Sequence, residues 1–353
     1  MSKLKPNKDI LDLVNNFTYG EDLGFGKTMA PVMIEMKYKD GKWSSPEYLP
    51  YGPLSIDPAA KVLHYAQEIF EGMKAYKNDK GEVYIFRPEA NAKRFNLSAI
   101  RMAMPEVPEE DFLDTVKSFS SLMAKHVPVG VNKSLYLRPF MIATEPTLGV
   151  KASSEYSYYL IGCLVERYFS RPSVKVMVEL DNCRAAPGGI GYAKTGGNYG
   201  ASLAAYKKTQ DHKCDQTLWL DALNKKYVEE LSGMNFFAVI GNDLVTPELT
   251  DTILAGITRD AILKVAQRFN LTPVEKKLEI TTLLDSISSG ECKEAFACGT
   301  ASVLTPIESL EYKDKTYKLS IPDGDKSKQI KDYILGIQRG LEKDPHNWAV
   351  KVN

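Results

Sequence analysis

The sequence predicts a two-domain protein of the mixed α/β class. Its 353 residues favour two domains, because a domain typically takes roughly 100–200 residues. Segments that alternate like strands are interspersed with segments at helical spacing in both halves of the chain. The composition changes at 167–175 (RYFSRPSVK), where an Arg-Pro-Ser stretch separates two strand-like runs. We therefore expect an N-terminal domain at 1–166, a linker at 167–175 and a C-terminal domain at 176–353.

The first half mixes strands and helices, which favours an antiparallel-rich α/β domain. The Asp40-Gly41 pair is a typical hairpin turn, and Pro108 followed by acidic residues is a typical helix start. Phe95, Ala99 and Met102 recur at helical spacing. The expected elements are strands at 31–43 and 82–88, helices at 89–104 and 108–127, and strands at 133–145 and 155–169.

The second half begins with a strand and then a glycine-rich segment at 188–200. A helix is expected to begin near Ile257–Thr258, and Gly299-Thr300 interrupts a strand. The expected elements are strands at 174–180, 216–221, 225–231, 234–241 and 294–307, a short strand and helix within 277–290, and helices at 201–210, 255–270 and 326–342.

Composition argues against several classes of protein. Lys plus Arg equals Asp plus Glu, 45 each, so no net charge points to nucleic acid or an anionic membrane. The longest apolar run, near Tyr158–Val165, is far shorter than the ~18 residues of a membrane span. Five scattered cysteines without a C-x-x-C pair argue against disulfides and a zinc site. We expect a cytoplasmic protein without a bound metal, and no secretory signal in the polar segment 1–9.

The most unusual segment is PGGIGYAKTGGNYG at 187–200, in which glycines surround Lys194. Glycines let the backbone approach a flat ligand closely, and a desolvated lysine can supply the neutral amine that Schiff-base chemistry needs. A solvated surface turn is the alternative. A nucleotide-binding loop fits poorly, because Ala193 stands where the P-loop pattern requires its second glycine.

Other segments carry weaker signals that each also fit an ordinary structural role. Glu230 precedes small residues and a strand, where a carboxylate can keep a pyridinium nitrogen protonated. Backbone N–H groups at Ile257 and Thr258, and those of the CGTAS segment, can bind phosphate.

In the first half, Arg94 could act as a phosphate clamp. Tyr136 and Arg138 fall on one face of a strand. Tyr65 and Phe70 suit the apolar lining of a small-substrate pocket, and equally a plain core.

Together these segments resemble the fold-type IV pyridoxal-phosphate enzymes and, within them, the branched-chain aminotransferases. The resemblance runs from about 28 to 340. The segments that carry it, in the family's order, are LHYAQEIFEGMKAY, IFRPEANAKRF, LYLRPFMIATEPTLGV, KTGGNYG, EELSGMNFF, LVTPELTDTILAGITRD and FACGTASVLTP. It implies a smaller N-terminal and a larger C-terminal α/β domain with pyridoxal 5'-phosphate between them.

The resemblance also implies roles for single residues. Lys194 resembles the catalytic Schiff-base lysine, Tyr199 the partner of the cofactor's phenolic oxygen, and Glu230 the carboxylate at the pyridine nitrogen. The resemblance assigns a phosphate site to Arg94, Ile257, Thr258 and Thr300, and a substrate-carboxylate site to Thr300 and Ala301. It assigns the side-chain pocket to Tyr65, Phe70, Tyr136 and Arg138. The loop at Gly149–Val150 resembles one that reaches a neighbouring subunit, which implies a homodimer.

The implied reaction is transfer of an amino group between leucine, isoleucine or valine and 2-oxoglutarate. Ser302 and Thr305 stand where animal members carry a redox C-x-x-C pair, which favours a bacterial-type enzyme. The alternatives are a D-amino-acid aminotransferase or an aminodeoxychorismate lyase of the same fold, a nucleotide-binding protein, and a non-catalytic binding protein. Sequence does not decide the preference among the three amino acids, the direction of the reaction in the cell, or any regulation.

Overall fold

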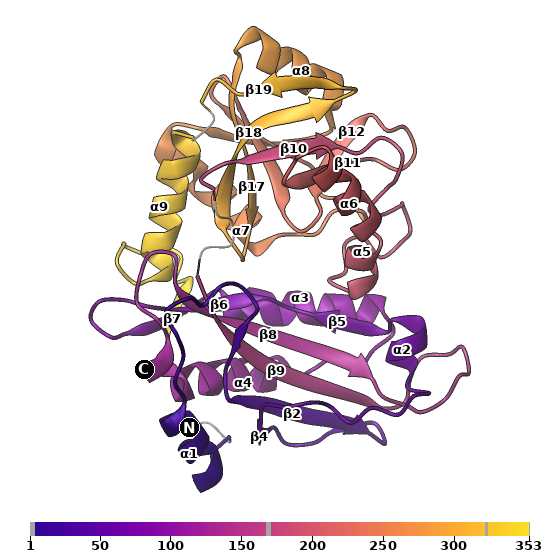
Figure 1. The fold of residues 1–353 in the computed structure, drawn as a ribbon, viewed down its shortest axis with the longest axis vertical. Helices are drawn as coiled ribbons and strands as arrows, with labels where there is room; N and C mark the ends of the chain where they lie inside the picture. Colours follow the sequence, from indigo (N-terminus) through magenta and orange to yellow (C-terminus); the bar gives the residue numbers. More distant parts are fainter. Residues whose placement is uncertain (1–3, 167–170, 322–323, 353) are drawn as a thin grey trace. The chain divides into compact units, whose positions relative to one another are not determined.

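The computed structural model describes residues 4–166, 171–321 and 324–352 (Figure 1). They form two compact units, which agrees with the expected two-domain α/β class. Residues 167–170 of the predicted linker lie outside the described residues. The described parts of unit 1 are 4–166, 193–196 and 336–352, and those of unit 2 are 171–192, 197–321 and 324–335. The boundary between the units is therefore not a single one at 167–175, because segments 193–196 and 336–352 also belong to unit 1.

Unit 1 is built on one antiparallel sheet, in which the long strands β8 and β9 run side by side (Figure 1). The strands are β1 (Thr28–Met29), β2 (Val32–Lys39), β3 (Lys42–Trp43), β4 (Glu47–Pro50), β5 (Glu68–Phe70), β6 (Met73–Lys77), β7 (Val83–Phe86), β8 (Ser134–Ala143), β9 (Tyr156–Val165) and β20 (Ala349–Lys351). The helices are α1 (Lys8–Asn16), α2 (Lys61–Tyr65), α3 (Pro88–Arg101), α4 (Glu109–Leu122) and the 3-10 turn η1 (Ala124–His126).

The strand order in this sheet is β20-β7-β6-β8-β9-β2-β3, with β1 on β9, β4 on β2 and β5 on β8. Asp40 and Gly41 both have positive φ (51° and 76°), as the two-residue hairpin between β2 and β3 requires. The pairing of β20 with β7 explains why the C-terminal segment belongs to unit 1.

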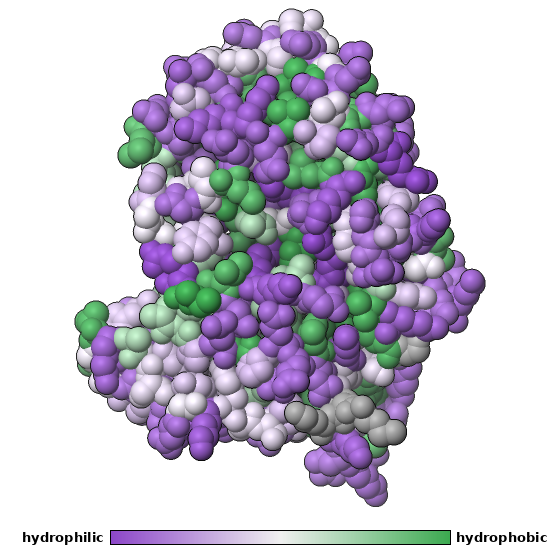
Figure 2. All heavy atoms as spheres, turned by 180° about the vertical axis from the view of Figure 1, so that it is seen from behind, coloured by the Kyte–Doolittle hydropathy of each residue, from purple (hydrophilic) through white to green (hydrophobic). Residues whose placement is uncertain are grey.

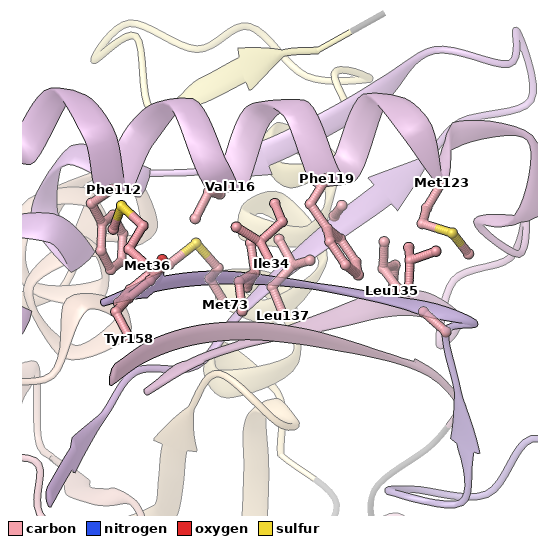
Figure 3. Close-up of a cluster of buried hydrophobic side chains, with 14 of the residues drawn as sticks. Ile34, Met36, Met73, Phe112, Val116, Phe119, Met123, Leu135, Leu137 and Tyr158 are labelled. Atoms are coloured by element: carbon pink, nitrogen blue, oxygen red, sulfur yellow. The ribbon is translucent and has the colours of Figure 1, made fainter. Parts of the chain in front are cut away.

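Helix α4 closes the core of unit 1 by laying one apolar face on the sheet (Figure 3). Phe112, Val116, Phe119 and Met123 recur every three or four residues and are fully or almost fully buried. They point at side chains of the sheet strands β2, β6, β8 and β9, namely Ile34, Met36, Met73, Leu135, Leu137 and Tyr158 (Figure 3). Burying each large apolar side chain contributes about 1.5–3 kcal/mol, so this face is a main source of stability for unit 1.

Unit 2 is built on a second, mixed sheet. Its strands are β10 (Val174–Val178), β11 (Gln216–Leu220), β12 (Tyr227–Leu231), β13 (Asn235–Ile240), β14 (Asp243–Pro247), β15 (Thr272–Lys276), β16 (Leu278–Glu279), β17 (Cys292–Gly299), β18 (Val303–Tyr312) and β19 (Lys315–Lys318). Its helices are α6 (Leu203–Asp211), α7 (Ile257–Val265), α8 (Ile280–Ser289) and the 3-10 turn η2 (Ala266–Phe269). Two further helices, α5 (Gly196–Gly200) and α9 (Lys326–Gln338), contain the points at which the chain changes unit.

The order of this sheet is β15-β14-β13-β17-β18-β10-β11-β12-β16, with β19 on β18. Strand β10 is parallel to β11 and β18, and β14 is parallel to β15, whereas the other strand pairs among the described residues of this sheet are antiparallel. Strands β12 and β13 also pair at Glu230 and Asn235. This pairing brings a carboxylate and an amide together in the middle of unit 2.

The predicted elements are present, although several of them end earlier than predicted. The helix predicted at 108–127 ends at Leu122, and the one predicted at 326–342 ends at Gln338. The strand predicted at 294–307 is the hairpin β17–β18, because the chain reverses at 300–302. Part of the strand predicted at 155–169 lies outside the described residues.

The surface drawn in Figure 2 is mainly hydrophilic, with hydrophobic residues in small separate groups. Within the described residues no helix has the length and apolar character that a membrane span demands. All five cysteines are free thiols.

Candidate active site

Lys194 is fixed by the N-terminal unit, although it lies far along the chain. Its backbone N–H donates to Ser98 Oγ of α3 at 2.9 Å, and its carbonyl accepts from the N–H of Phe70 in β5 at 3.0 Å. The next residue, Thr195, donates its hydroxyl to the Glu68 carbonyl at 2.7 Å. The short segment 193–196 therefore behaves as part of unit 1, and these bonds set where the Lys194 side chain begins.

Two basic side chains, Lys194 and Arg138, lie beside the Phe70 ring. Lys194 Nζ lies 4.8 Å from the ring centroid, and the Arg138 guanidinium carbon lies 4.6 Å from it. Arg138 also donates to the Tyr136 hydroxyl at 3.0 Å, as expected from their common face on β8. Sequence reasoning grouped Phe70, Tyr136 and Arg138, and the structure brings them together beside Lys194.

Glu68 lies in the same cluster and was not predicted from the sequence. Its carboxylate accepts a short hydrogen bond from the N–H of Gly196. Burial raises the pKa of the Glu68 carboxyl, although the Gly196 N–H and the Arg138 charge act in the opposite direction. A Cβ at position 196 would overlap this carboxylate, which explains the first glycine after Lys194 and Thr195.

Arg94 is buried and forms a two-pronged ion pair. Its Nε and Nη2 contact the Glu71 carboxylate at 2.7 Å and 2.8 Å, and the Glu71 side chain is fully buried. This geometry is the strong fork-to-fork arrangement of arginine with a carboxylate. The sequence suggested a phosphate clamp, whereas the structure pairs this edge of the Arg94 guanidinium with Glu71.

The loop at Thr144–Ser153 is tied to α2. Tyr65 donates its hydroxyl to the Leu148 carbonyl at 2.5 Å, and the fully buried Lys61 donates to the carbonyls of Gly149 and Lys151. The Val150 side chain is 87% exposed, and Tyr65 is 40% exposed. The loop is therefore anchored at its backbone while its apolar tip faces solvent.

Glu230 is the centre of a buried polar cluster in unit 2. Arg184 Nη1 lies 2.8 Å from Glu230 Oε1, and Asn235 Nδ2 donates to Glu230 Oε2 at 2.9 Å. The N–H of Leu254 donates to Oε1 at 3.3 Å. Arg184, Glu230 and Asn235 are each at most 6% exposed. Three donors around a buried carboxylate favour its anionic form and fix its direction.

The predicted phosphate-binding segment lies at the start of α7. Gly256 is the N-cap, and among the described residues no side chain caps it. A Cβ at Gly256 would overlap Asn235 Oδ1, so the same asparagine that holds Glu230 also requires a glycine here. Ile257 and Thr258 are the first two helical residues, as predicted.

The remaining predicted residues of unit 2 lie in two places. Thr300 and Ala301 are half-buried in the reversal between β17 and β18. Tyr199 is half-buried in α5, and a Cβ at Gly233 would lie 3.8 Å from its ring. Tyr199 is therefore next to the β12–β13 turn that follows Glu230.

Sequence reasoning missed Arg184, Asn235 and Ser98. The sequence does contain a local indication of Asn235, because a tight turn after Glu230 places Asn235 opposite Glu230 in an antiparallel pair. No local pattern indicates Arg184 or Ser98, because Arg184 lies 46 residues from Glu230 and Ser98 lies 96 residues from Lys194.

A family model for amino-transferase class IV matches residues 68–310. The chain belongs to this family. It is 44% identical over 340 residues to a branched-chain-amino-acid aminotransferase of Mycolicibacterium smegmatis, covering 94% of this chain and 92% of the relative. It is 42% identical over 335 residues to branched-chain-amino-acid transaminase 1 of Bacillus subtilis, covering 94% of each.

Solved class IV enzymes share the fold. The Escherichia coli branched-chain amino acid aminotransferase gives a TM-score of 0.74 at 26% identity, covering 90% of this chain and 99% of that one. The enzyme of Thermobaculum terrenum, solved in its pyridoxal-phosphate form, gives 0.71 at 22% identity, covering 90% and 98%. The class IV assignment disfavours a nucleotide-binding protein.

Proposed function

We propose that this class IV aminotransferase transfers an amino group between leucine, isoleucine or valine and 2-oxoglutarate, giving branched-chain 2-oxo acids and L-glutamate. The substrate assignment depends on one observation. Relatives named as branched-chain aminotransferases are 42% and 44% identical to this chain over 94% of its length. A D-amino-acid aminotransferase and a lyase of the same fold are less consistent with those relatives.

The residues present fit pyridoxal 5'-phosphate as the cofactor. The chain offers an amine (Lys194) in a glycine-rich loop, a buried carboxylate (Glu230), and a helix N-terminus at Ile257 and Thr258 for phosphate. Arg94, Thr300 and Tyr199 are the proposed further contacts. When bound, the cofactor supplies an aldehyde that accepts the amino group and a ring that withdraws electrons from the substrate's Cα.

The chain's own groups then orient the substrate and move its proton. Lys194 Nζ takes the proton from the substrate's Cα and later returns one, as a base and then an acid. Glu230 would contact the pyridine nitrogen and favour its protonated form, and Arg184 and Asn235 hold the Glu230 carboxylate in place for this role.

Substrate selection is assigned to the cluster around Phe70. Tyr65 and Phe70 form the proposed apolar side-chain pocket, and Val150 is proposed to reach the corresponding pocket of a second copy. Arg138 and Tyr136 receive the second carboxylate of glutamate, because a guanidinium beside a hydroxyl matches an anion and not an isobutyl group. The backbone of Thr300 and Ala301 takes the carboxylate that both kinds of substrate share.

We also propose that the enzyme is a cytoplasmic homodimer. The exposed apolar tip at Leu148 and Val150 suits a contact with a second copy. Five free thiols suit a reducing compartment.

Borohydride labelling tests the central assignment. Protein purified with its cofactor should be yellow, and reduction should attach the cofactor to the peptide that contains Lys194. Lys194→Ala should fold normally but lose at least about 10³-fold in turnover with leucine and 2-oxoglutarate. A label on another lysine, or an unlabelled protein, would reject the proposal.

A further inference from the structure

Strand β5 places Glu68 on the sheet face that carries the proposed specificity residues. Glu68 and Phe70 are two residues apart in β5, so their side chains point to the same face of the sheet. Phe70 pairs with Phe140 of β8, and Arg138 lies two residues before Phe140, on that same face. An acidic residue, an aromatic ring and a guanidinium therefore share one face of unit 1.

The Glu68 carboxylate is fixed by the segment that contains Lys194. Glu68 Oε1 accepts a short hydrogen bond from the N–H of Gly196, and the Glu68 backbone carbonyl accepts from the Thr195 hydroxyl at 2.7 Å. A Cβ at position 196 would overlap Glu68 Oε1, so the glycine permits this close approach. Because both bonds come from consecutive residues of one segment, the carboxylate is held in one place beside the loop of Lys194.

Glu68 lies close enough to Arg138 for the two charges to interact. The Arg138 guanidinium carbon is 4.6 Å from the centre of the Phe70 ring, on whose other contact list stands Lys194 Nζ at 4.8 Å. The Arg138 charge lowers the pKa of the Glu68 carboxyl, as the Gly196 N–H also does, against the larger effect of burial. The attraction between two charges acts equally on both, so the ionised Glu68 carboxylate offsets part of the positive potential around Arg138.

A positive potential at this place has different consequences for the two proposed substrates. Glutamate brings a second carboxylate, which an arginine attracts, whereas leucine brings an uncharged isobutyl group that gains nothing from the charge. The proposed reaction binds both substrates in turn, so an arginine at full strength would favour glutamate at the expense of leucine. Specificity is a difference between two affinities, and a fixed opposing charge lowers only the one that depends on charge.

We propose that Glu68 is a specificity-determining residue, whose fixed negative charge offsets Arg138 and so limits how much more tightly the site binds a dicarboxylate than a branched-chain substrate. The inference rests on the proposed function, because it takes Arg138 as the group that receives the second carboxylate of glutamate. Glu68→Gln removes the charge but keeps a side-chain oxygen that can accept from Gly196. This variant should therefore bind dicarboxylates more tightly and leave the affinity for branched-chain substrates nearly unchanged.

Calorimetric titration of the holoenzyme with two unreactive acids tests the proposal. Glutarate has the carbon skeleton of glutamate and 4-methylpentanoate that of leucine, and neither has an amino or oxo group, so binding is measured without chemistry. We expect Glu68→Gln to bind glutarate at least fivefold more tightly than the native enzyme does, and 4-methylpentanoate within twofold. The half-saturating concentration of glutamate in single-turnover experiments should fall by a similar factor. Unchanged or weaker binding of glutarate, or an equal gain for both acids, overturns the proposal.

Two further variants separate the charge of Glu68 from other effects. Glu68→Asp keeps the charge, and should keep the native ratio of the two affinities within twofold. Glu35→Gln removes a buried carboxylate of the same sheet, where it contacts Tyr159 and Lys37, and should change glutarate binding less than twofold. A gain in Glu68→Asp equal to that in Glu68→Gln would show a packing effect, and an equal gain in Glu35→Gln would show a diffuse charge effect. Either result overturns the proposal.

The proposed function and the role of Glu68 can fail separately. A native enzyme that does not transfer the amino group of leucine to 2-oxoglutarate would refute the substrate assignment and this inference with it. An enzyme that performs the transfer, but binds glutarate equally in its native and Glu68→Gln forms, would retain the proposed function and refute only the role of Glu68.

Discussion

Arg184 and Glu230 form an ion pair inside unit 2, with Nη1 and Oε1 2.8 Å apart and both side chains at most 4% exposed. Arg184 also donates to the carbonyls of Thr252 and Gly191, at 3.0 Å and 3.3 Å. Arg184 therefore links the Glu230 carboxylate, which is proposed to contact the cofactor's ring nitrogen, to the backbone at Gly191 and Thr252.

Arg184→Met should destabilise the protein by about 3–5 kcal/mol, because it leaves the Glu230 charge buried without its cationic partner. The measurement is chemical denaturation, together with the dissociation constant of pyridoxal phosphate, which should rise. Arg171→Met is the matched control, since its pair with Asp215 is largely exposed and should contribute only about 0–1 kcal/mol. Equal losses in the two variants would contradict the role given to Arg184.

Arg138→Ala should separate the two half-reactions. The guanidinium beside Tyr136 is assigned to the second carboxylate of glutamate, and a hydrogen bond to a charged group contributes about 1.5–3 kcal/mol. Single-turnover rates should therefore fall about 10- to 100-fold with glutamate and much less with leucine. Arg138→Lys should restore part of the glutamate rate, whereas equal losses with both substrates would refute this division of labour.

Glu294→Ala should loosen the start of α9. The buried Glu294 carboxylate accepts from the N–H groups of Asp325, Lys326 and Ser327 at 2.9–3.1 Å and from the Ser327 hydroxyl at 2.7 Å. It acts as a side-chain cap supplied by β17, and its removal leaves these donors, including the buried N–H and hydroxyl of Ser327, without this acceptor. We expect a loss of about 1–3 kcal/mol in unfolding free energy.

The neighbouring exposed Glu291 provides the control for this prediction. Glu291→Ala should change the unfolding free energy by less than about 0.5 kcal/mol, as usual for surface substitutions. Hydrogen exchange should show faster exchange in α9 for Glu294→Ala alone. Unchanged protection of α9 would mean that the cap does not hold the helix.

The buried Glu68 carboxyl should make the stability of the protein depend on pH. Burial raises the pKa of its carboxyl in the folded state, so the folded protein binds this proton more tightly than the unfolded chain. The resulting stabilisation is complete below the unfolded pKa of about 4.3 and is lost as the pH rises through the folded pKa. Glu68→Gln lacks this titration, and should become steadily more stable relative to the native protein as the pH rises from about 4 through the folded pKa. Denaturation at several pH values tests this, and a constant difference would disprove it.

Much of the site could be predicted because its residues belong to short local patterns. Lys194 stands in a glycine-rich segment, Tyr136 and Arg138 share a strand face, and Ile257 follows the N-cap glycine of a helix. The residues that orient these groups could not be predicted, because their partners are distant in sequence. Ser98 holds the Lys194 backbone, Glu71 occupies one edge of Arg94, and Arg184 holds Glu230.

The sequence by itself determined the mixed α/β class, the longer helices and many of the strands, and the chemical character of the proposed site, because periodicity and local composition act over a few residues. Short elements such as α2, β5 and β20 were not predicted. Only the tertiary structure decided that segments 193–196 and 336–352 belong to the N-terminal unit, and that Arg184 pairs with Glu230. Both depend on which strands pair and which face of a strand is covered. The free energy that fixes such pairing comes from burial and hydrogen bonds between residues far apart in the chain, which no local pattern records.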